Sequence, residues 1–74
     1  MNMKRETNNF IGIKEEKINN KTIWKANIVY EKENIFIGEY EDPIMAAKAY
    51  DKKAMELYGH MVGRLNFPED WPVY

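Results

Sequence analysis

The sequence predicts a small α+β domain in which a three-stranded antiparallel sheet packs against one C-terminal α-helix. Two observations lead to this prediction: short segments of alternating apolar and polar residues fill the first half of the chain, and one capped helical segment follows them. A chain of 74 residues has room for one domain only. We divide it into a flexible leader at residues 1–9, the domain at residues 10–68 and a tail at residues 69–74.

The three predicted strands cover residues 10–14, 23–30 and 34–40. The second is the clearest, because Trp24, Ala26, Ile28 and Tyr30 alternate with Lys25, Asn27 and Val29. Gly12, inside the first strand, suggests a bulge or a close approach of two backbones. A longer connection at residues 17–22 and a short turn at residues 31–33 join the strands as consecutive hairpins.

The predicted helix covers residues 43–58 and has a signal at each end. Asp42 is a suitable N-cap, Pro43 fits the first helical position, and Gly59 fits the C-terminal cap. Such a helix is about 24 Å long, close to the ~23 Å of a seven-residue strand. One face carries mostly small side chains, which let the helix approach the sheet: Ala46, Ala47, Tyr50, Ala54 and Leu57.

Several classes of site lack the residues that they need. Without cysteine there is no disulfide, thiolate zinc site or cysteine nucleophile, and the single histidine, His60, cannot hold a metal alone. Asp51 has no second carboxylate or nucleophile placed to work with it, so we interpret it as structural. We expect no enzyme, no cofactor, no membrane span and no secretory signal.

Motifs along the chain resemble those of the APETALA-two/ethylene-response-factor DNA-binding domain. The resemblance covers roughly residues 10–68, and its helix and closing motifs are specific enough to make accidental similarity unlikely. The motifs are Phe10-Ile11-Gly12-Ile13-Lys14, Trp24-Lys25-Ala26 with Ile28, Ile37-Gly38-Glu39-Tyr40, Ala46-Ala47-Lys48-Ala49-Tyr50-Asp51 with Ala54, Leu57 and Gly59, and Leu65-Asn66-Phe67-Pro68. The chain looks nearer to the apicomplexan and endonuclease-associated branches than to the plant branch.

The resemblance implies a three-stranded sheet with a helix across it, in agreement with the periodicity. It also implies sequence-specific binding of double-stranded DNA, with the outer face of the sheet in the major groove, as the DNA-binding module of a transcription regulator. Such a protein acts in the nucleus of a eukaryote and in the cytoplasm otherwise. The closing motif implies that Asn66 hydrogen-bonds backbone near the sheet.

Strand alternation predicts which side chains face away from the helix. If Trp24 and Ile28 point inward, their neighbours on the same strand point outward. The predicted DNA-contacting residues of the strands are Lys14, Lys25, Asn27, Val29, Asn34 and Phe36, with Glu16 beside them. Lysines in the turns are expected to reach phosphates: Lys17, Lys21 and Lys32.

The plant proteins of this family carry several arginines on the outward face, which suit guanine edges, and this chain lacks them. Those positions hold Ile11, Lys14, Glu16, Val29 and Asn34, so a GC-specific target does not carry over. Asparagines that pair with adenine favour a target with A·T pairs or of mixed composition.

Two features leave a second function open. The net charge is −1, whereas nucleic-acid binders usually carry a basic excess. We expect the Phe36 ring to be exposed, and an exposed ring suits a protein interface as well as DNA. The alternative is therefore a protein–protein interaction or dimerisation module that kept the fold and lost DNA binding. Exposed sheet edges permit a homodimer or contact with a neighbouring domain of a longer chain.

Overall fold

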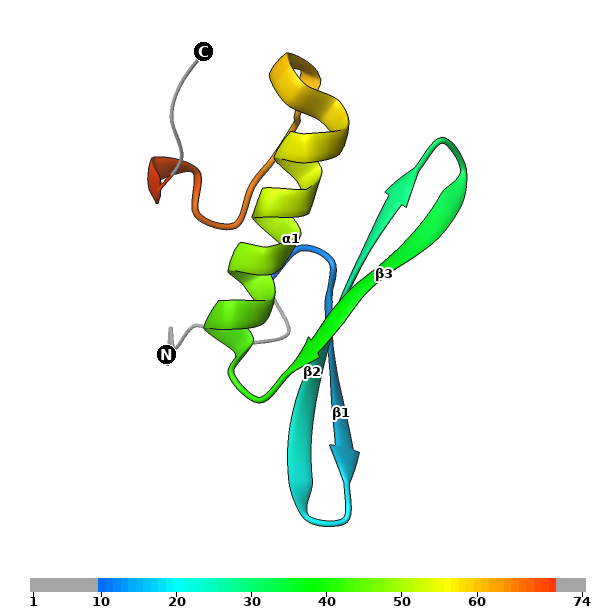
Figure 1. The fold of residues 1–74 in the computed structure, drawn as a ribbon. Helices are drawn as coiled ribbons and strands as arrows, with labels where there is room; N and C mark the ends of the chain where they lie inside the picture. The colour runs from blue at the N-terminus through cyan, green and yellow to red at the C-terminus, as the bar shows by residue number, and fades with distance from the viewer. Residues whose placement is uncertain (1–9, 71–74) are drawn as a thin grey trace, which may run out of the picture.

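A computed structural model of the chain describes residues 10–70 and confirms the predicted α+β fold. The elements in chain order are β1 (Ile13–Ile18), β2 (Lys21–Tyr30), β3 (Glu33–Tyr40), α1 (Pro43–Tyr58), η2 (Gly59–Met61) and η3 (Pro68–Asp70). The strands form one antiparallel sheet in the order β1-β2-β3. The helix lies on one side of this twisted sheet, and the two hairpin turns lie at opposite ends (Figure 1). The predicted leader and residues 71–74 of the tail lie outside the described residues.

Both hairpin turns are tighter than the sequence predicts. Each consists of two residues with positive φ: 51° and 66° at Asn19 and Asn20, and 52° and 70° at Glu31 and Lys32. Two consecutive left-handed residues form the turn whose twist matches that of the flanking strands. The predicted long connection at residues 17–22 is therefore wrong, and its outer residues extend β1 and β2 instead.

The first strand begins at Ile13, not at Phe10, because Gly12 turns the backbone just before it. Gly12 has a φ of 76°, and a Cβ atom there would clash with the Tyr50 ring and the Asn27 carbonyl oxygen. The Asn27 N–H donates a hydrogen bond to the Gly12 carbonyl at 2.9 Å. The close backbone approach expected at this glycine is confirmed, although it lies outside the strand.

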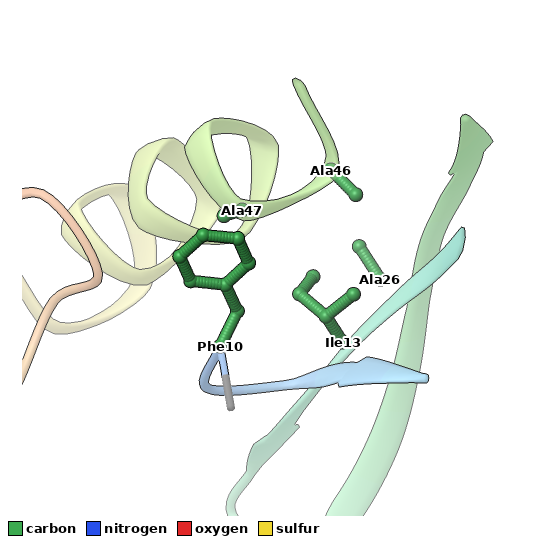
Figure 2. Packing of buried hydrophobic residues seen from close by; sticks show 5 residues of the cluster. All are labelled: Phe10, Ile13, Ala26, Ala46 and Ala47. Carbon is green, nitrogen blue, oxygen red and sulfur yellow. The ribbon is translucent and has the colours of Figure 1, made fainter. Parts of the chain in front are cut away.

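The helix caps and the core agree with the sequence. The Asp42 carboxylate accepts from the Ile44 N–H at 2.9 Å, and the Gly59 N–H donates to the Met55 carbonyl. Figure 2 shows the core between helix and sheet, where five buried residues meet. They are Phe10, Ile13, Ala26, Ala46 and Ala47. Because three of the five are alanines, the helix backbone lies close to β2, as predicted.

Trp24 packs beside this core, which confirms the prediction that it points toward the helix. Its ring packs against the buried cluster from β2, together with Ile37 and Tyr40 from β3. Within the described residues the buried Trp24 Nε1 makes no hydrogen bond. The tryptophan therefore contributes to the sheet through its apolar area and not through its polar atom.

A polar latch ties the closing motif to the helix and to the segment before β1. Asp51 is fully buried, and its two carboxylate oxygens each accept a backbone N–H at 2.8 Å, from Asn66 and Phe67. Asn66 in turn accepts from the Ile11 N–H at 2.6 Å and donates to the Ile11 carbonyl at 3.2 Å. These contacts confirm the structural roles predicted for Asp51 and Asn66.

Candidate nucleic-acid interface

The strand register defines an open face of the sheet, on the side away from the helix. Buried Ile13 and Ala26 are paired across β1 and β2, so the next pair, Lys14 and Lys25, points to the opposite side. The open face continues through every second pair and consists of Lys14, Glu16, Ile18, Lys21, Ile23, Lys25, Asn27, Val29, Asn34, Phe36 and Glu39. All six strand residues predicted for DNA contact lie on it, with Glu16.

A bulge in β3 explains why Glu39 also lies on the open face. Ala26 is paired with Gly38 but Asn27 is paired with Phe36, so Ile37 is an extra residue in β3. Simple alternation from Ile35 and Ile37 would place Glu39 on the helix side. The register instead pairs it with Lys25. Sequence reasoning missed this carboxylate; Gly38, a glycine inside a strand, was the available signal.

One end of the open face carries a carboxylate clamp, formed by Glu16, Lys25 and Glu39 from three neighbouring strands. The Lys25 Nζ lies 2.7 Å from a Glu16 carboxylate oxygen and 3.9 Å from one of Glu39. The hydrogen bond and charge of Lys25 lower the pKa of Glu16, and the same contact raises the pKa of Lys25. Lys25 is therefore engaged by carboxylates that a phosphate or a base would have to displace.

The other end carries two amide–apolar rows. Asn27 on β2 is paired with Phe36 on β3, and Val29 on β2 is paired with Asn34 on β3. Val29 is 61% exposed and Phe36 is 55% exposed, which is high for apolar side chains in a sheet. In the part of the chain that the structure describes, neither asparagine side chain makes a hydrogen bond. Both amides are thus available to a ligand.

The helix supports these rows from behind. The Tyr58 hydroxyl, at the end of α1, donates to the Val29 carbonyl at 2.7 Å. Its ring packs edge-on against Tyr30, with centroids 5.2 Å apart. These contacts attach the projecting β2–β3 hairpin to the helix, so the rows rest on a fixed support.

The turn lysines differ in their surroundings. Lys21 forms an ion pair with Glu41 at 3.0 Å, whereas Lys17 and Lys32 are exposed and form no ion pair among residues 10–70. Lys17 is paired with Thr22 on the helix side of the sheet, at the end of the first hairpin. Lys32 occupies the second turn, next to the rows. The predicted phosphate contacts therefore rest mainly on Lys14 and Lys32.

Comparisons with protein-family models, curated proteins and solved structures give no match to this chain. Among residues 10–70, no group of three or more histidine, aspartate or glutamate side chains is placed to hold a metal ion. No helix within that range is long and apolar enough to cross a membrane.

Proposed function

We propose that this chain is a sequence-specific binding domain for double-stranded DNA, with the open face of the sheet in the major groove. One observation carries the proposal. The helix covers one face of the sheet, and the open face presents asparagine amides, apolar side chains and a lysine in adjacent rows. The major groove of B-DNA admits a two-stranded β-ribbon. The motifs that resemble the APETALA-two/ethylene-response-factor domain support the same role, as the DNA-binding module of a transcription regulator.

The charges of the open face favour modest affinity. Lys14 makes no ion pair within the described residues, whereas Lys25 is held by Glu16 and Glu39. Lys14 on the open face and Lys32 in the adjoining turn form no ion pair among residues 10–70. If each neutralises one phosphate, the slope of log affinity against log salt is about −1.8. A neighbouring domain or a second copy would then add the remaining affinity.

Protein binding is the second candidate, and the carboxylate clamp favours it. Two glutamates on the open face repel phosphates, and exposed Phe36 and Val29 suit the centre of a protein interface. In this case the fold is kept, DNA binding is lost and the partner is another protein.

Selection from a pool of randomised duplexes at low salt, with the whole chain, tests the two candidates. We expect a defined motif to be enriched, and Lys14→Ala to weaken binding several-fold. Lys52→Ala, at an exposed lysine of α1, is the matched control and should leave affinity nearly unchanged. No enrichment, with affinity no higher than that of a neutral control protein, would refute DNA recognition and favour the protein-binding module.

A further inference from the structure

We infer that each amide–apolar row recognises one A·T base pair, and that the two rows recognise A·T pairs of opposite orientation. This inference rests on the proposed DNA binding and specifies its target. It comes from the register, because each of the two cross-strand pairs combines one asparagine with one apolar side chain. The asparagine lies on β2 in the row of Asn27 and Phe36, and on β3 in the row of Val29 and Asn34.

The chemistry of one row matches that of one base pair. In the major groove, adenine offers an N7 acceptor and an N6 donor, which an asparagine amide pairs with in a bidentate manner. The thymine opposite it offers a methyl group, which an apolar side chain contacts. A G·C pair has no methyl group and presents a second acceptor where adenine has its donor. Each row is therefore complementary to A·T and lacks a group that favours G·C.

The geometry of the two rows sets the spacing. If β2 and β3 run along the groove, a cross-strand pair lies across it, in the direction of a base pair. The rows are two residues apart on β2, about 6.8 Å along the strand. Base pairs are about 3.4 Å apart along the duplex. The two recognised pairs are therefore separated by about one base pair.

The alternation of amide and apolar groups sets the orientation. Adenine recognised from β2 in the first row lies on one DNA strand, and adenine recognised from β3 in the second row lies on the other. The expected core has an adenine and a thymine on the same strand with one base pair between them, and the direction in which β2 runs along the groove decides which of the two is on the 5′ side. Neither row contains a charged side chain, so this preference is independent of the carboxylate clamp.

A change of specificity tests the inference more sharply than a loss of binding. Asn34→Arg replaces an adenine-pairing amide with a side chain that pairs with guanine. Selection with the wild-type chain should enrich the two A·T pairs, and the variant should prefer G·C at one of them by about tenfold. The preference at the other pair, which Asn27 contacts, should stay the same.

Glu33→Gln is the matched control. Glu33 precedes Asn34, is exposed and belongs to the opposite face of the sheet, and its substitution also makes the net charge more positive by one. It should raise affinity slightly for every duplex and leave the selected motif unchanged. Denaturant unfolding and circular dichroism of each variant confirm that the fold is kept.

The outcomes separate the inference from the function on which it rests. An enriched motif without the two A·T pairs, or one that Asn34→Arg leaves unchanged, overturns the assignment of the rows while DNA binding stands. No enriched motif with any variant overturns both. A motif that changes from A·T to G·C at one position only establishes the row of Val29 and Asn34 as a recognition unit.

Discussion

The covered and open faces of this sheet use the same strands for different tasks. Behind the covered face, buried alanines bring the helix close to the sheet, and the two carboxylate oxygens of the fully buried Asp51 each accept a backbone N–H group. On the open face, apolar side chains are exposed, and Lys25 is shared by two carboxylates. Substitutions on the covered face should therefore change stability, whereas those on the open face should change binding.

The largest expected effect is at Asp51, in the latch behind the covered face. Asp51→Ala leaves the N–H groups of Asn66 and Phe67 without their charged acceptor, at a cost of about 3–5 kcal/mol in the free energy of unfolding. Urea denaturation followed by circular dichroism measures it. The control is Asp70→Ala, which removes an exposed ion pair with Lys48 and should cost under about 1 kcal/mol. Equal losses in the two variants would show that the latch contributes nothing special.

The next effect is at the seam between helix and sheet. Ala47 is fully buried, so Ala47→Leu should overpack the seam and lower the free energy of unfolding by about 1–3 kcal/mol. Val29→Thr, on the open face, replaces an exposed side chain with one of nearly the same shape. It should lower the free energy of unfolding by less than about 0.5 kcal/mol. Thermal or urea unfolding of both variants checks the contrast. A loss of only a few tenths at Ala47 would mean that this side of the helix does not face the sheet.

On the open face, Glu16→Gln should increase binding. The substitution removes the carboxylate 2.7 Å from Lys25, so that the lysine becomes available to phosphates. Affinity should rise a few-fold for duplexes of any sequence, and the salt slope should steepen by about 0.9. Fluorescence anisotropy at several salt concentrations gives both quantities. Unchanged affinity and slope would show that Lys25 stays away from the DNA backbone.

The smallest effect concerns pH. The pKa of Glu16 is lowered below its ordinary value of 4.5 by the contact with Lys25. A lowered pKa in the folded state means that the ion pair contributes its stability above the unfolded pKa and loses it as the pH falls through the folded value. The urea midpoint of the wild type should therefore fall slightly more in acid than that of Glu16→Gln. Parallel curves for the two proteins would show that the pair has no net effect on stability.

The sequence predicts the fold well because its signals are local and consistent. Asp42, Pro43 and Gly59 define the helix ends, and period-two alternation defines β2 and its faces. The tight turn at Glu31 and Lys32 was not predictable in type, because neither residue favours positive φ. Its geometry follows from the paired strands on both sides.

The open face was predicted in composition but not in its charge pairing. Alternation from Ile13 and Trp24 places the lysines and asparagines correctly. The partnership of Lys25 with Glu39 depends on the bulge in β3, and its partnership with Glu16 depends on the register of β1. Both are relations between strands, which a pattern along one strand does not contain.

The extra residue Ile37 affects the shape of the sheet as well as the alternation of side chains along β3. A bulge bends its strand and increases the local right-handed twist, and this one lies between the carboxylate clamp and the amide–apolar rows. The open face is therefore two facets set at an angle. A rigid partner seated flat on the Asn27 facet meets the Lys25 facet obliquely, whereas a surface that winds can follow both. Removing Ile37 would straighten β3 and leave Glu39 paired with Lys25, because Phe36, Gly38 and Glu39 would then alternate regularly, and the open face would become one flatter facet with the same charges.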